Sequence, residues 1–171
     1  MLRLALLFVV VFGFMLVEAG RAASNERRQR ARGGIEPTHD VYPAMQVAYP
    51  GVFLAMLGEG LFRPAPAPAV LAAGIAVFVA GKALKWWAIS TLGDFWTFRV
   101  IVVPGSQPVA SGPYRWLRHP NYVGVFGELA GAGIIAAAPV AGVLGTLMFT
   151  GLMAARVRVE NRALDAILRR G

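Results

Sequence analysis

The sequence predicts an all-α integral membrane protein with about five transmembrane helices, forming a single domain over residues 1–171. Of the 171 residues, 57% are hydrophobic and only 15% are charged, and the mean hydropathy is +0.58. Apolar runs recur along nearly the whole chain, each close to the ~20 residues that a helix needs to cross the hydrocarbon core. This composition excludes an ordinary water-soluble domain.

The charged and metal-binding residue types narrow the function further. The net charge is +8, but the Lys and Arg residues sit mainly between and after the apolar runs, where membrane topology places them. We therefore expect a lipid membrane, and no nucleic acid, as their partner. The chain has no cysteine and two histidines, His39 and His119, so a disulfide framework is excluded and we expect no metal site.

The first predicted span covers residues 2–19. A secretory signal has a similar apolar core, but residues 20–40 then carry five arginines, and such a block resists translocation. A span with an external N-terminus fits this pattern better. The second span covers residues 41–62. Alternating prolines at positions 64, 66 and 68 then predict a tight external link, because no helix interior accepts them.

The third span covers residues 69–90, and we expect Lys82 and Lys85 to snorkel toward the nearby interface. Residues 91–122 contain repeated Gly and Pro, so they cannot form one transmembrane helix, and we predict a functional loop. Two shorter runs follow, over residues 122–137 and 140–155, split by Pro139. They predict a short helical hairpin.

The positive charges orient these spans. In the five-span arrangement 15 of the 17 Lys and Arg residues fall on one side: five in residues 20–40, five in 82–122 and five in 156–171. The other two are Arg3 and Arg63. The asymmetry predicts a multi-pass protein of the plasma (inner) membrane whose functional loop and C-terminus face the cytosol.

The densest polar and aromatic cluster is S-G-P-Y-R-W-L-R-H-P-N-Y, residues 111–122. One interpretation is a turn whose aromatic residues form a belt at the headgroups while Arg115 and Arg118 anchor it. The other is a ligand site, because the same string offers hydrogen-bond donors, stacking surfaces and a helix N-terminus suited to a carboxylate-bearing cofactor.

This string also carries a resemblance to a known family. G-P-Y-R-W-L-R-H-P-N-Y-V-G, followed by the hairpin and R-V-R-V-E-N-R-A-L at residues 156–164, resembles the isoprenylcysteine carboxyl methyltransferase family of membrane enzymes. Upstream, W-A-I-S-T-L-G and V-I-V-V-P-G, residues 87–93 and 100–105, are similar to a bacterial branch encoded beside type III polyketide synthases. For that branch the resemblance implies methylation of the hydroxyl of alkylpyrones.

The resemblance implies S-adenosyl-L-methionine as the cofactor, bound without a Gly-rich nucleotide fold. The residues that it assigns to cofactor binding are Tyr114, Leu117, His119, Pro120, Asn121, Tyr122, Glu160 and Asn161. Family members usually carry two adjacent acids where this chain has Glu160 and Asn161, although an asparagine can still hydrogen-bond a ribose or an amine.

Arg156 and Glu160 are four residues apart and so share one helical face just past the last span. Either they form an ordinary ion pair that anchors the helix, or they are catalytic, with Arg156 also orienting an ionised acceptor. Glu128 lies inside the fourth span, where a bare charge is costly, so it should find a partner or contact the substrate. Arg156, Lys82 and the sulfonium region of the cofactor are the candidates.

The sequence therefore predicts an S-adenosylmethionine-dependent O-methyltransferase whose lipophilic acceptor enters from the bilayer. An alkylpyrone hydroxyl is the expected acceptor, an isoprenylcysteine carboxylate is a second class, and a type III polyketide synthase is an expected functional partner. Two alternatives remain open. Membrane sterol-type reductases share an R-H-P-x-Y-like loop but use NADPH, and a non-enzymatic scaffold would bind neither cofactor.

Overall fold

The computed structural model describes residues 1–37 and 40–168, with side chains described up to residue 163. His39 and the two arginines Arg169 and Arg170 lie outside the described residues. The part that is described forms five α-helices, two short 3-10 helices and an isolated β-bridge. The prediction of an all-α membrane protein is thereby confirmed.

The helices follow the order of the predicted apolar runs. The long helices are α1 (Leu2–Ala31), α2 (Tyr42–Leu61), α3 (Pro68–Leu92), α4 (Pro120–Ala136) and α5 (Pro139–Leu168). The segment between α3 and α4 contains the 3-10 helices η1 (Gly93–Phe95) and η2 (Gly112–Arg115). It forms no long helix, as its Gly and Pro content predicts.

Two helices run well past the predicted spans. α1 continues to Ala31 and α5 to Leu168, whereas the apolar runs end near residues 19 and 155. Hydropathy marks the edge of the membrane, but Arg, Glu, Gln and Ala are good helix formers, so the backbone stays helical beyond it. The hairpin is therefore asymmetric, with a 17-residue α4 and a 30-residue α5.

Three of the five described helices are long and apolar enough to cross a membrane on their own. They are α1, α3 with its following turn (Pro68–Phe95), and α5 as far as Ala163. α4 is short, with 17 residues, and α2 contains the polar residues Gln46 and Glu59 as well as Pro50. Of the five predicted spans, three thus correspond to helices whose length and hydropathy suffice to cross a membrane.

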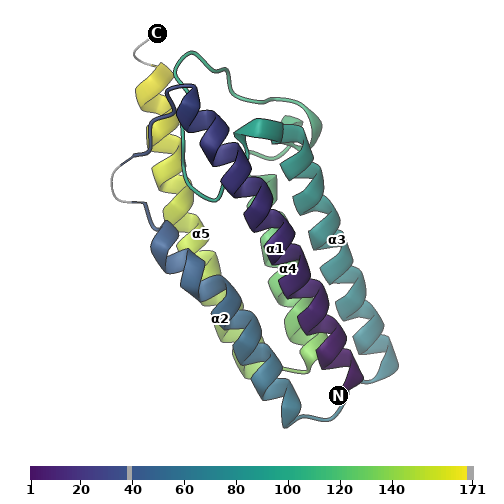
Figure 1. Cartoon of the computed structure of the whole chain (residues 1–171). Coiled ribbons are helices and arrows are strands. Elements are labelled where there is room, and N and C mark those ends of the chain that lie inside the picture. Colours follow the sequence, from purple (N-terminus) through teal and green to yellow (C-terminus); the bar gives the residue numbers. More distant parts are fainter. Residues whose placement is uncertain (38–39, 169–171) are drawn as a thin grey trace.

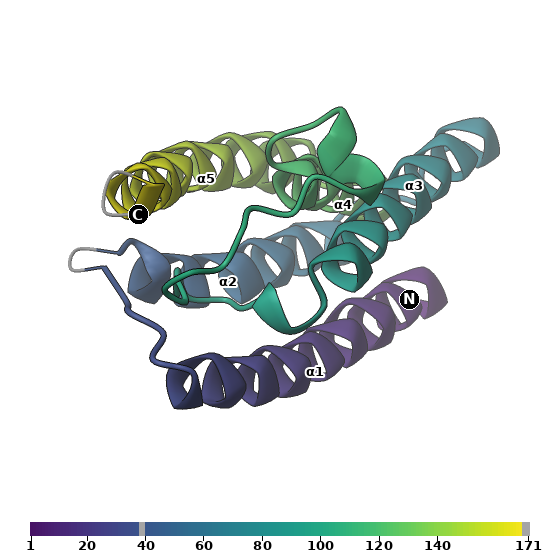
Figure 2. The ribbon, with the colours of Figure 1, turned by 90° about the horizontal axis from the view of Figure 1, so that it is seen from above.

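The bundle is built around α4, which contacts all four other long helices. Figures 1 and 2 show α4 between α3 and α5, with α1 and α2 along its other side. Phe53, Met56 and Leu129 are almost completely buried at the centre. α3 lies so close to α4 that a Cβ atom added at Gly131 would come within 2.5 Å of the backbone nitrogen of Phe78.

The segments that connect the helices lie at the two ends of the bundle. The end of α1 with residues 32–37, the α3–α4 segment and the end of α5 gather at one end in Figure 1. The start of α1, the α2–α3 link and the α4–α5 turn lie at the opposite end. The segments that carry most of the positive charge therefore share one end, and the candidate site lies there.

Candidate active site

Two cavities adjoin at this end. The bundle cavity, about 350 Å³, lies among α1, α2, α4 and α5 and reaches from Glu18 and Lys85 to Arg156. The loop cavity, about 610 Å³, lies under the α3–α4 segment and against α4 and α5. Both are lined by Trp96, Thr97, Asn121 and Tyr122. These four residues therefore form a shared wall between a largely apolar compartment and a more polar one.

The roof of both cavities is held in place by α1. The side-chain amide of Asn25 donates hydrogen bonds to the carbonyl oxygens of Gly93 and Trp96, at 2.9 and 2.8 Å. Gln29 donates one to the carbonyl of Asp94, at 2.8 Å. Because these amides are buried, they need partners, and the first turn of the loop supplies them.

A second attachment joins the two loops at this end. Ile35 and Val102 form an antiparallel bridge, with two N–H to O=C bonds of 2.9 Å. Nearby, Glu36 accepts hydrogen bonds from Arg30 and Arg99, each at 2.7 Å. Burial by itself raises the pKa of the Glu36 carboxyl, but the bonds from Arg99 and Arg30 outweigh it and hold the pKa below its usual range.

Glycine makes the return of the loop possible. Gly112 has φ +54°, a conformation that other residues rarely adopt, and a Cβ atom there would lie 2.5 Å from Oγ1 of Thr91. The tight turn brings Tyr114 into the wall of the loop cavity. Burial raises the pKa of the Tyr114 hydroxyl well above its usual value, and the charge of Glu160 adds to the rise. The hydroxyl therefore stays protonated and remains a hydrogen-bond donor.

The start of α4 presents the H-P-N-Y string to the cavities. His119 precedes the helix and Pro120 is its first residue, where a missing N–H costs nothing. This places Asn121 and Tyr122 in the first turn, at the shared wall. The side-chain Oδ1 of Asn121 is buried and has no hydrogen-bond partner among the described residues. A buried polar atom of this kind fits a site that is completed by a ligand.

A polar cluster, here called the loop cluster, joins Asp40, His119, Tyr122, Arg156 and Glu160. The Tyr122 hydroxyl donates to Glu160 Oε1 at 2.5 Å, and His119 Nδ1 lies 3.3 Å from Glu160 Oε2. The predicted contact of Arg156 with Glu160 is present, with Nε 3.4 Å from Oε1. The Glu160 side chain is still 25% exposed.

Arg156 has further partners that its spacing from Glu160 does not reveal. Its Nη1 lies 2.9 Å from Asp40 Oδ2, and its Nη2 donates to the carbonyl of Phe98. Within the loop cluster one arginine thus faces two carboxylates, with His119 beside the Glu160 carboxylate. Of the two acids, Glu160 is the more exposed, and its carboxylate is the one that a ligand in the loop cavity can contact.

The structure brings together most of the residues that the sequence analysis singled out. Those that line the loop cavity are Tyr114, His119, Asn121, Tyr122, Glu160 and Asn161, and Arg156 lines the bundle cavity. Three of them do not line either cavity: Leu117 is 38% exposed, Pro120 is buried at the start of α4, and Glu128 is buried within the bundle. For Leu117 the turn of η2 directs the residue outward, which spacing along the loop does not reveal.

Glu128 belongs to a second group, the bundle cluster: Glu18, Tyr49, Lys82, Lys85 and Glu128. Glu128 pairs with Lys82 at 2.8 Å and with Lys85 at 3.3 Å, so Lys82 is the partner found among the three candidates. Glu128 itself is not part of the lining of either cavity.

The expected snorkelling of the two lysines is wrong. Their side chains are only 12% and 3% exposed, because the acids Glu18 and Glu128 draw them into the bundle. The sequence analysis missed Glu18, Tyr49 and Asp40. A signal was available for Glu18, since an acid within the predicted first span needs a partner.

The geometry defines a membrane protein with a polar site at one end of its bundle and an apolar compartment beside it. Residues 74–166 match the isoprenylcysteine carboxyl methyltransferase family, and the chain belongs to it. Membership places the chain among membrane methyltransferases.

Two relatives match over nearly their whole length. The chain is 29% identical to YpbQ of Bacillus subtilis (strain 168), over 94% of this chain and 95% of that protein. It is 21% identical to a protein of Haemophilus influenzae (strain Rd), over 96% of each chain. Both are described as uncharacterized. No solved structure matches the chain.

Proposed function

We propose that the chain is an S-adenosylmethionine-dependent O-methyltransferase of the plasma membrane, which binds its donor in the loop cavity and a lipophilic acceptor in the bundle cavity. The observation that carries this proposal is the shared wall of Trp96, Thr97, Asn121 and Tyr122. A transferase needs two substrates side by side, and here a polar compartment and an apolar one meet along one face.

The loop cavity offers the donor a carboxylate and several hydrogen-bonding groups. When bound, S-adenosylmethionine supplies an electrophilic methyl group on a positively charged sulfur. The Glu160 carboxylate lines this cavity and is partly exposed, and Asn121 has an unused buried oxygen. We assign donor binding to Tyr114, His119, Asn121, Tyr122, Glu160 and Asn161.

The residues at the junction would align the acceptor and keep out water. Trp96 is buried and stacks edge-on against Phe98, closing the wall from the loop side. Arg156 is anchored on Asp40 and Glu160 while it lines the bundle cavity, so its guanidinium would orient an acidic hydroxyl that arrives ionised. Catalysis would then rest on alignment rather than on a covalent intermediate.

The acceptor follows from the resemblance and from the apolar bundle cavity. We expect the hydroxyl of a polyketide alkylpyrone, or of a similar lipid, with an isoprenylcysteine carboxylate as the second class. The acceptor would enter from the bilayer, and a type III polyketide synthase would be the functional partner. The loop cavity and the C-terminus would face the cytosol, because the positive charge gathers at that end.

The decisive experiment measures methyl transfer from radiolabelled donor by the purified chain, offered alkylpyrones, alkylresorcinols or prenylcysteine. Labelled product with an alkylpyrone is the expected result. Binding of NADPH in place of S-adenosylmethionine would instead favour the reductase alternative, and binding of neither would favour a scaffold. Reporter fusions at residue 171 and in the link of residues 64–68 should report opposite sides of the membrane.

A further inference from the structure

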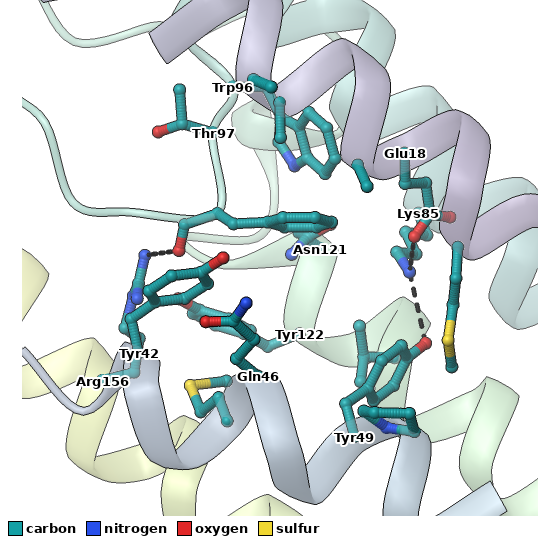
Figure 3. Close-up of a pocket in the computed structure, with 18 of the residues that line it drawn as sticks. Glu18, Tyr42, Gln46, Tyr49, Lys85, Trp96, Thr97, Asn121, Tyr122 and Arg156 are labelled. Atoms are coloured by element: carbon teal, nitrogen blue, oxygen red, sulfur yellow. Dashed lines mark hydrogen bonds and ion pairs between the residues drawn. The ribbon is translucent and has the colours of Figure 1, made fainter.

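The bundle cavity is polar at both of its ends. Figure 3 shows Tyr42, Thr97 and Arg156 on one side and Glu18, Tyr49 and Lys85 on the other. Between them the lining is largely apolar, with Met15, Met45, Val125 and Phe149 among its residues. The Arg156 side adjoins the loop cavity, and the mechanism above uses it. The opposite side has no role in that mechanism.

The groups at this far end form a dense network. Lys85 Nζ lies 2.6 Å from Glu18 Oε2 and 3.3 Å from both Tyr49 OH and Glu128 Oε2. The Glu18, Lys85 and Glu128 side chains are 1%, 3% and 1% exposed. Two lysines balance two glutamates, so the bundle cluster is neutral as a whole.

The network does more than hold the helices together, because only some of its side chains are enclosed between helices. The others face the bundle cavity. Glu18, Tyr49 and Lys85 line the bundle cavity, while Lys82 and Glu128 lie behind them. Glu18 Oε1 has only a long contact, 3.4 Å from Lys82 Nζ. The Tyr49 oxygen donates its proton to Glu128 and accepts from Lys85, which leaves it a second lone pair. The cavity face therefore still has capacity for hydrogen bonds.

We infer that Glu18, Tyr49 and Lys85 form a second polar subsite, which binds a hydroxyl group at the far end of the acceptor. The inference rests on the proposed function. A charged group would upset the balance of a neutral cluster in a low-dielectric interior. The three N–H groups of Lys85 are already used, so a neutral hydroxyl would bind by donating its hydrogen bond to Glu18 Oε1 or to the Tyr49 oxygen. A volume of about 350 Å³ limits the occupant to a compact molecule. The acceptor is therefore an apolar molecule with two oxygen functions, one methylated at the shared wall and one held here.

The test compares acceptors that differ in one oxygen. Calorimetry on the full chain in detergent would measure the affinity for an alkylphenol and for the three dihydroxybenzenes with the same alkyl chain. A second oxygen held by charged partners should make at least one dihydroxy isomer bind roughly tenfold tighter. Tyr49→Phe keeps the ring and its packing, and should reduce this ratio to about twofold. The matched control, Tyr42→Phe, removes a hydroxyl from the opposite side of the same cavity and should leave the ratio unchanged.

The outcomes separate the subsite from the overall function. Equal affinity of the wild-type chain for all four compounds, or a ratio that Tyr49→Phe does not change, would overturn the subsite even if methyl transfer proceeds. A tenfold ratio that disappears in Tyr49→Phe supports the subsite. If, in that case, radiolabelled donor yields no methylated product from any acceptor, the methyltransferase proposal fails while the subsite stands.

Discussion

The loop cluster and the bundle cluster use similar residues for different purposes. In each, a tyrosine donates a hydrogen bond to a glutamate, Tyr122 to Glu160 and Tyr49 to Glu128. The bundle cluster balances two acids with two lysines, and the Glu128 side chain is 1% exposed. The loop cluster sets two acids against one arginine, and the Glu160 side chain is 25% exposed. The two clusters therefore differ in burial and in the number of basic side chains that share two acids.

The largest effect is expected from breaking the balance of the bundle cluster. Lys85→Met leaves the carboxylates of Glu18 and Glu128 short of a partner in a dry interior, which should lower the free energy of unfolding by about 3–5 kcal/mol. Denaturant unfolding of the purified variant measures this. The double variant Lys85→Met with Glu18→Gln restores neutrality and should recover much of the loss. A single variant within about 1 kcal/mol of wild type would show that the cluster is not a balanced unit.

In the loop cluster, removal of one charge should affect the ligand more than the fold. Glu160→Gln removes the carboxylate that we assign to the donor site, so affinity for S-adenosylmethionine should fall roughly tenfold to a hundredfold, as expected for a hydrogen bond to a charged group. Calorimetric titration provides the measurement. Glu59→Gln is the control, since this acid caps α5 through the N–H groups of Val140 and Ala141 at the other end of the bundle. Unchanged donor affinity in Glu160→Gln would remove Glu160 from the site.

Arg156 tests whether geometry matters in the loop cluster as well as charge. Its guanidinium contacts Asp40, Glu160 and the carbonyl of Phe98 at once, and a lysine ammonium cannot span all three. Arg156→Lys should lower kcat roughly tenfold while donor affinity stays within about twofold. Steady-state kinetics together with donor titration separate the two effects. A wild-type kcat would support a purely anchoring role.

A smaller loss of donor affinity is expected at His119. Truncation to alanine removes one hydrogen-bonding ring from the loop cavity, which should weaken donor binding about fivefold. His119 lies in the turn that precedes α4 and outside the hydrophobic core, so truncation leaves no large core cavity and Tm should hardly change. Thermal unfolding and titration of the same preparation make the comparison. A lowered Tm with normal affinity would indicate a structural role instead.

The smallest effect concerns the attachment of the two loops through Glu36. Because its pKa is lowered in the folded chain, Glu36 stabilises the fold fully above its unfolded pKa of about 4.3 and loses this effect as the pH falls through the lower, folded-state value. The contribution of such an exposed pair is below about 1 kcal/mol. The difference in Tm between wild type and Glu36→Gln should therefore shrink between pH 7 and pH 3.5. A difference that is constant over this range would contradict the assignment.

Much of the fold could be predicted from local signals. Apolar runs located all five helices, and Gly and Pro located the loop between α3 and α4. The lengths of α1 and α5 could not be predicted in this way, because hydropathy does not report a helix that continues into water. The close approach of α3 and α4 depends on small residues such as Gly127 and Gly131, whose G-x-x-x-G spacing allows helices to pack tightly.

The site was predictable where its residues are close in sequence. Sequence spacing alone predicted the polar string of residues 111–122 and the i,i+4 contact between Arg156 and Glu160. The partners Asp40 and Glu18 lie 116 and 67 residues from the basic residues that they contact, Arg156 and Lys85, so only the fold brings them together. Lys82 and Lys85 point into the bundle because they pair with the acids of the bundle cluster. Their position near the membrane interface alone predicted that they would point toward water.

The hydrogen bonds from α1 divide the α3–α4 segment into two parts with different freedom of motion. Residues 93–103 are tied to Asn25, Gln29 and Ile35, and opening them would break several bonds together. For residues 104–110 the hydrogen bonds within the described chain run only from Ser106 to the carbonyl of Val103. We therefore expect donor and product to exchange by displacement of residues 104–110 alone. The wall between the two compartments would stay in place during each exchange, and the acceptor would not need to leave when the spent donor does.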